Sequence, residues 1–153
     1  MARPTPHRLE DYPHSRVLTT RWMDNDAYGH MNNVVYYSLF DTLVNAWLIE
    51  HGALDVEKGE VVGFVVETGC HYFSPLAYPE PVTGALRVAH IGRSSVRYEL
   101  ALFAKSSNLA AAQGHFVHVY VDREGRRPVA ELPTALQLAL KPLHVATPST
   151  EET

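Results

Sequence analysis

The 153-residue chain has one cysteine and only a mild excess of negative charge. Cys70 alone cannot form an internal disulfide or a multi-cysteine metal site, which fits a reducing, cytoplasmic setting. No apolar run reaches the roughly 18 residues of a membrane-spanning helix, and no basic segment leads into an apolar stretch. The net charge of −4 gives no indication of nucleic acid. We expect an unexported protein with neither a membrane nor a nucleic-acid partner.

Three signatures of catalytic machinery are also missing. The sequence contains no His-Glu-x-x-His pair, no Gly-x-Ser-x-Gly motif and no glycine-rich phosphate loop. Of its nine histidines, His115 and His118 stand three apart in a predicted strand, so their side chains should point to opposite faces. We therefore expect no metal site and no redox cofactor.

The length and composition predict a single domain over residues 1–153. A content of 46% hydrophobic and 20% charged residues is ordinary for a globular chain with a sizeable core. Both ends are polar, and the first thirteen residues contain three prolines. We expect residues 1–13 and 147–153 to be loosely held.

One long helix is predicted over residues 33–50. Its polar positions Ser38, Asp41 and Asn45 fall three and four apart on one face, and most other positions are apolar. This pattern indicates a helix with a wide buried surface and a narrow wetted stripe. His51 and Gly52 supply the stop signal.

Strands surround this helix in the sequence. The run 15–23 is rich in β-branched and aromatic residues, and alternating or apolar runs follow at 61–74, 82–91, 95–104 and 110–122. A short helix is expected over residues 133–140. The order β–α–β–β–β–β predicts an α+β fold in which an antiparallel sheet curls around the helix, because a helix that is apolar on nearly all sides needs cover from more than one direction.

A polar stretch joins the first strand to the helix, and its ten residues 24–33 include Asp24, Asp26, Gly29, His30 and three asparagines. The first amides of a helix lack intrahelical partners and carry about half a positive charge. Such amides can stabilise the negative charge that develops on a thioester carbonyl under attack, and a carboxylate nearby can attack the carbonyl or activate water. An ordinary reading also exists, since Asn32 or Asn33 could simply cap the helix.

The stretch WMDNDAYGHMNNVVYY resembles the signature of hotdog-fold acyl-CoA thioesterases of the 4-hydroxybenzoyl-CoA thioesterase type. The agreement in element order extends over roughly residues 14–140. The resemblance implies a long central helix wrapped by a curved antiparallel sheet of about five strands. It also implies that Asp26 is the catalytic carboxylate, as nucleophile or as general base. The N–H of Asn33 would then polarise the carbonyl, with His30 orienting the substrate or only holding the loop.

Further substrate contacts can be named. Gly29 lets the turn take a positive φ or lets a ligand approach the backbone closely, and we expect the acyl chain to lie along an apolar face that includes Tyr37, Phe64 or Trp47. The turn Arg93-Ser94-Ser95 would hold the phosphates of coenzyme A, unless it is only a hairpin. Coenzyme A is part of the substrate, so no separate cofactor is implied. The acyl group, and the choice between coenzyme A and acyl carrier protein, stay open.

Assembly and two rival functions complete the sequence-based hypotheses. One sheet around one helix leaves strand edges uncovered, and members of the superfamily pair into dimers and often tetramers with the active site at the subunit boundary. We expect a homo-oligomer. A hotdog hydratase or dehydratase stays open because of His30, and so does a protein that binds acyl thioesters without turning them over.

Overall fold

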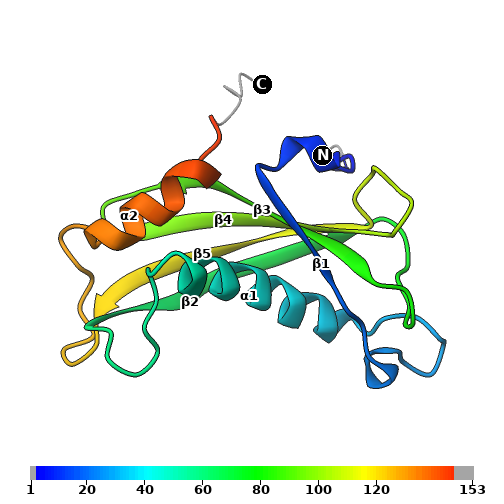
Figure 1. Ribbon diagram of the computed structural model, residues 1–153, viewed down its shortest axis with the longest axis horizontal. Coiled ribbons are helices and arrows are strands. Elements are labelled where there is room, and N and C mark those ends of the chain that lie inside the picture. The colour runs from blue at the N-terminus through cyan, green and yellow to red at the C-terminus, as the bar shows by residue number, and fades with distance from the viewer. Residues whose placement is uncertain (1–2, 147–153) are drawn as a thin grey trace.

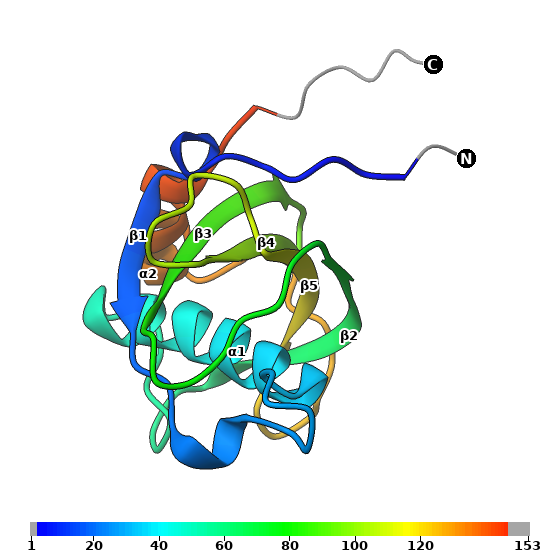
Figure 2. The same cartoon turned by 90° about the vertical axis from the view of Figure 1, so that its right-hand side faces the viewer.

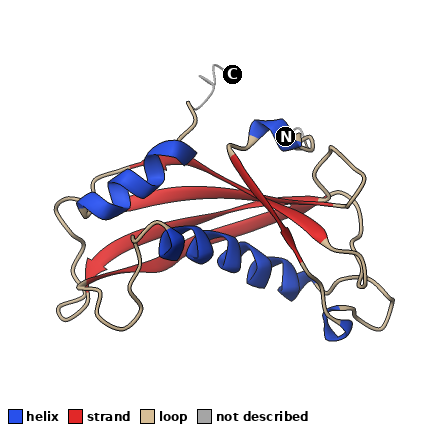
Figure 3. Cartoon of the chain, viewed as in Figure 1, coloured by secondary structure: helices blue, strands red, loops and turns tan. Residues whose placement is uncertain are grey.

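The computed structural model describes residues 3–146 and has the α+β architecture expected from the sequence (Figures 1 and 3). Its elements are β1 (His14–Leu18), α1 (Asn33–Glu50), β2 (Val61–Tyr72), β3 (Val82–Ile91), β4 (Ser95–Phe103), β5 (Ala112–Asp122) and α2 (Thr134–Leu140), with three short 3₁₀ turns at Leu9–Asp11, Trp22–Asp24 and Lys141–Leu143. The tail 147–153, expected to be loose, lies outside the described residues. Within residues 3–146, no helix has both the length and the apolar character that crossing a membrane requires.

All five strands form one antiparallel sheet in the order β1-β3-β4-β5-β2. The meander β3-β4-β5 lies at its centre, as the alternating runs predicted. Short β1 and long β2 form the two edges. From the side shown in Figure 2, the sheet curves over α1. The expected sheet wrapped around a long helix is therefore confirmed.

Local signals set both ends of α1. Asn32 is the N-cap, and its side-chain oxygen accepts the N–H of Val34 at 3.1 Å. At the other end Gly52 adopts φ +69°, and two reversed bonds close the helix: Gly52 N–H to Ile49 O at 3.1 Å and Ala53 N–H to Leu48 O at 2.8 Å. The predicted range 33–50 is confirmed because cap and stop are both encoded locally.

The core lies between α1 and the concave face of the sheet. Alternate residues of β4 (Val96, Tyr98, Leu100 and Leu102) are fully buried there against Phe40, Leu43 and Val44 of α1. The helix α2 packs beside the C-terminal end of α1, where the indole N–H of Trp47 donates to Ala139 O at 2.8 Å. This end of the molecule is therefore closed by α2.

The N-terminal lead-in covers part of the opposite face of the sheet. The sequence predicted a loose segment over residues 1–13, but Tyr12 is buried against Phe103 and the N–H of His7 donates to the Gln113 side chain at 2.7 Å. Backbone bonds from Leu9 N–H to Asn108 O and from Ala110 N–H to His7 O tie the lead-in to the β4–β5 loop. The prediction is wrong for these described residues, because burial of an aromatic side chain holds a polar segment in place.

The first strand is also shorter than the run 15–23 predicted. It ends at Leu18, and residues 22–24 form a 3₁₀ turn. Buried Asp24 accepts the backbone N–H of Arg21 at 2.8 Å and its guanidinium at 2.9 Å. This side-chain capping competes with strand pairing and outweighs the strand propensity of Thr19, Thr20 and Trp22.

Candidate active site

Hydrogen bonds to the Trp22–Asp24 turn and to the segment after β2 hold the loop that precedes α1. Asp24 O accepts the N–H of Asn32 at 2.9 Å, which ties the turn to the helix cap. Met31 N–H donates to Leu76 O at 2.7 Å, and the Asn25 side chain bonds both backbone groups of Tyr78. The loop is therefore anchored to the segment that follows β2 rather than free at the surface.

Asp26 organises a tight turn within this loop. Its Oδ1 accepts the N–H of Tyr28 at 2.8 Å and of His30 at 3.3 Å, and its own N–H donates to His30 O at 2.8 Å. Gly29 adopts φ +79°, a conformation that side chains rarely take. The other carboxylate oxygen, Oδ2, accepts no hydrogen bond from the described chain, and Asp26 is half-buried. One oxygen thus holds the turn and the other is free.

A cavity of about 440 Å³ opens at the N-terminus of α1, lined by His30, Met31, Asn33, Tyr36, Tyr72, Phe73, Ser74 and Pro75. The N–H of Asn33 has no acceptor in the described chain, whereas those of Val34 and Val35 bond to Asn32. An unpaired first-turn amide at the positive end of a helix is therefore part of this cavity wall.

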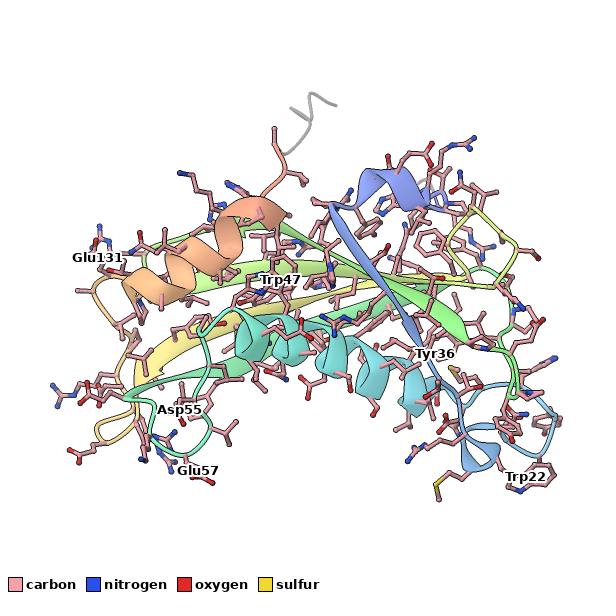
Figure 4. All side chains as sticks on the ribbon, in the orientation of Figure 1. Trp22, Tyr36, Trp47, Asp55, Glu57 and Glu131 are labelled. Carbon is pink, nitrogen blue, oxygen red and sulfur yellow. The ribbon has the colours of Figure 1, made fainter. Side chains whose placement is uncertain are left out.

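Asp26 lies beside the cavity but is not one of its lining residues. Two hydrogen bonds tie it to the wall residue His30, whose backbone O accepts the Asp26 N–H at 2.8 Å and whose N–H donates to Asp26 Oδ1 at 3.3 Å. Burial, in the first place, raises the pKa of the wall residue Tyr36, and the Cys70 thiol and Asp26 add to this shift. Figure 4 shows Tyr36 at the end of α1 next to the loop. The carboxylate and the free amide thus occupy one end of the molecule.

Aromatic side chains form the remaining wall. The rings of Tyr36 and Tyr72 meet edge to face, with centroids 4.9 Å apart. Burial, in the first place, and the nearby Cys70 thiol raise the pKa of Tyr72, so its hydroxyl stays protonated. Burial also raises the pKa of the Cys70 thiol to about 11, which leaves little nucleophilic thiolate near pH 7. The carboxylate of Asp26 is therefore the better candidate for attack or base catalysis.

The three residues predicted to contact the acyl chain lie in different parts of the molecule. Tyr37 is half-buried and follows the wall residue Tyr36 in α1, and its ring meets that of Phe40 edge to face, with centroids 6.2 Å apart. Phe64 pairs in register with Val119, on the face of the sheet turned away from α1, and is 44% exposed. Trp47 lies about 21 Å along α1 from Asn33, at 1.5 Å per residue, against α2. Only Tyr37 is brought near the cavity within this chain.

The predicted phosphate-binding turn lies at the other end of the molecule. Arg93 lines a larger cavity of about 950 Å³ between the β3–β4 turn and α2, together with Lys141, His144 and the apolar Ile91, Leu132 and Leu138. Ser94 and Ser95 flank this turn, and Ser94 O accepts the N–H of Tyr120 at 2.7 Å. Glu131, which also lines this cavity, is far from Tyr36 in Figure 4.

Sequence reasoning missed several wall residues: Met31, Tyr72, Phe73, Ser74 and Pro75. Tyr72 ends β2 and the next three residues follow it, almost forty residues after the motif, and no local pattern marks them. As for metals, among residues 3–146 no three His, Cys, Asp or Glu side chains are grouped so that they could hold an ion.

Comparisons with known proteins show the family to which the chain belongs. The sequence matches the thioesterase-like superfamily over residues 20–140. The PA5185 protein of Pseudomonas aeruginosa PAO1 is 51% identical, with a TM-score of 0.88, and the match covers 94% of this chain and 99% of that one. No curated protein sequence matches the chain.

Two further solved structures are thioesterases by description. PA2801, a putative thioesterase from Pseudomonas aeruginosa, is 26% identical over 84% of this chain and 98% of its own, with a TM-score of 0.76. A thioesterase from Thermus thermophilus, complexed with coenzyme A and Zn, is 28% identical over 88% and 96%, with a TM-score of 0.68. The chain therefore belongs to the thioesterase-like superfamily and has the hotdog fold of thioester hydrolases.

Proposed function

We propose that this protein is an acyl-CoA thioesterase that hydrolyses an acyl thioester to a carboxylate and free coenzyme A. The observation that carries the proposal is the unpaired N–H of Asn33, a residue of the cavity wall at the positive end of α1, with the carboxylate of Asp26 in the adjoining turn, hydrogen-bonded to the wall residue His30. A relative 28% identical was solved with coenzyme A, which supports this thiol carrier.

The reaction needs few groups. The thioester carbonyl oxygen would accept the Asn33 N–H, whose hydrogen bond strengthens as negative charge develops on that oxygen. Asp26 would remove a proton from the attacking water, or attack the carbonyl carbon itself to give an anhydride that water then opens. In either route a C–O bond forms, the C–S bond breaks, and the departing thiolate takes up a proton. The route stays open between these two roles.

The proposed enzyme works as a homodimer paired along β2. This edge strand has twelve residues, and three consecutive ones, Phe64, Val65 and Val66, are 44%, 48% and 60% exposed. A long apolar edge is a template for pairing with a second chain. The exposed Val34 and Ile49 on α1 extend the uncovered apolar surface. A tetramer built from such dimers is an open alternative.

Pairing also gives the Arg93 turn a role. Within one chain this turn and Asn33 lie at opposite ends of α1, which is about 27 Å long at 1.5 Å per residue. An antiparallel pair would bring the Arg93 end of one subunit toward the Asn33 end of its partner. Arg93, Ser94 and Ser95 would then bind the phosphates of coenzyme A held by the other subunit.

Thiol release tests the function directly. The purified protein is mixed with acyl-CoA esters of short, medium, long and aromatic acyl groups, and free thiol is measured with a colorimetric dye. Enzyme-dependent release from at least one ester is expected. Hydration of an enoyl-CoA without thiol release would instead indicate the hydratase class. Binding of acyl-CoA with neither reaction would indicate a non-catalytic acyl-thioester protein.

Changing Val66 to Lys should separate the subunits. Val66 lies at the β-bulge between Val65 and Glu67, and a lysine charge on an edge strand opposes pairing with another edge. We expect sedimentation to show a monomer and thiol release to fall at least about tenfold, because each site would lose its partner. Val56→Lys is the matched control, since Val56 is 67% exposed outside the sheet. Unchanged mass and activity in Val66→Lys would contradict the proposed interface.

A further inference from the structure

We infer that the hydroxyl of Ser74, which lines the same cavity as Asn33, is a second hydrogen-bond donor to the thioester carbonyl. The inference rests on the proposed thioester chemistry of this cavity and adds a catalytic residue to it. Ser74 belongs to the segment after β2, far in sequence from the motif before α1, and both line the same cavity.

The position of Ser74 is firmly set by its backbone. The N–H groups of Phe73 and Ser74 both donate to Ala111 O, at 2.7 and 3.1 Å. Pro75 follows, and its ring restricts the backbone of Ser74 to extended conformations. One residue further on, Leu76 O accepts the N–H of Met31 in the loop before α1. The segment carrying Ser74 is thus tied both to the sheet and to the loop before the helix.

The hydroxyl itself is available. Ser74 is exposed, and in the described chain its Oγ neither donates nor accepts a hydrogen bond. Other hydroxyls near this end of the molecule are engaged: Thr20 donates to Glu80 O at 2.9 Å and Thr68 to His115 O at 2.9 Å. A serine held by its backbone with a free hydroxyl in a cavity wall is placed to donate to a ligand.

Thioester hydrolysis would benefit from a second hydrogen-bond donor at the carbonyl oxygen. As water or carboxylate adds to the carbonyl carbon, the oxygen becomes an oxyanion with room for two or more donors. The Asn33 N–H supplies one. Among the other polar groups of the wall, His30 donates only if its tautomer allows. The Ser74 hydroxyl can rotate to follow the oxygen as the carbon becomes tetrahedral.

Steady-state kinetics test this inference. Ser74→Ala should lower kcat for thiol release by roughly 100-fold with KM within about threefold, because the lost donor acts mainly in the transition state. Ser74→Thr keeps the hydroxyl and should retain kcat within about threefold. Ser106→Ala, at an exposed serine in the β4–β5 loop, is the control and should match wild type. A wild-type kcat in Ser74→Ala, or an equal loss in Ser74→Thr with unchanged thermal midpoints, would overturn the inference.

A binding measurement separates this inference from the proposed hydrolysis. A ketone analogue of acyl-CoA, with CH₂ in place of the sulfur, keeps the carbonyl, and an S-alkyl-CoA thioether lacks it. By calorimetry, Ser74→Ala should weaken the ketone analogue roughly two- to tenfold and leave the thioether unchanged. This result holds even if wild type releases no thiol, in which case hydrolysis alone fails. Equal effects on both analogues would refute the hydrogen bond from Ser74.

Discussion

Asp26→Asn is expected to lower kcat for thiol release by about 10³-fold while leaving the fold intact. In this structure the substitution should remove the charge of residue 26 without changing the hydrogen bonds of the turn. Asparagine keeps an Oδ1 that can accept the N–H groups of Tyr28 and His30, so the turn should retain its shape. What disappears is the negative charge on Oδ2, the oxygen that no group of the described chain occupies. Thiol release and the thermal midpoint are measured on the same preparation.

Asp41→Asn is the matched control. Asp41 is an exposed carboxylate on α1, about two turns beyond Asn33, and contacts Asn45 through a local hydrogen bond at 3.2 Å. The same loss of charge there should change thiol release by no more than about twofold, since exposed charges are screened by solvent. If Asp26→Asn keeps activity within about tenfold of wild type, Asp26 is not the catalytic carboxylate.

The long helix could be predicted to the residue because its boundaries are local. The Asn32 cap and the Gly52 stop act within one turn of their own positions. Alternation likewise predicted which β4 side chains face the core. It also placed His115 and His118 on opposite faces, and the structure puts His115 against Glu67 while His118 packs on Tyr98. These features depend on residues that are close in the sequence, so they can be predicted from one sequence alone.

Positions that depend on distant parts of the chain could not be predicted in this way. In β2 the run VVGFVV is apolar on both faces, so its pattern does not say which side chains face α1, and a β-bulge follows between Val65 and Glu67. Within one chain Phe64 faces away from α1, and its contact with the acyl chain stays a prediction. The distance between Arg93 and Asn33 could not be predicted from the sequence either, because it depends on the direction of the strands relative to the helix. Long-range packing, rather than local preference, decides these positions.

Assembly of the cavity depends on a close approach that sequence patterns do not reveal. Gly114 on β5 lies under α1, where an added Cβ would stand 2.5 Å from Gly69 O and 2.8 Å from Cε2 of Phe40. The first of these is a backbone atom of the neighbouring strand β2, and Phe40 is fully buried. Moving the Gly69 carbonyl would disturb the β2–β5 pairing, and moving the Phe40 ring would disturb the packing of α1 on the sheet. The absence of a side chain at Gly114 therefore sets how closely the helix lies on the sheet.

Gly114→Ala should accordingly lower the free energy of unfolding by about 3 kcal/mol. Because a displaced α1 would carry the Asn33 amide away from Asp26 and Ser74, thiol release from the folded fraction should fall as well. Gly52→Ala is the comparison: its φ of +69° strains an alanine, but no atom lies within 4 Å of the added Cβ, so a cost of about 1 kcal/mol is expected. Urea unfolding of both variants measures the difference. A loss in Gly114→Ala no larger than in Gly52→Ala would mean that strand and helix can yield at this contact, and that the position of the Asn33 amide does not depend on it.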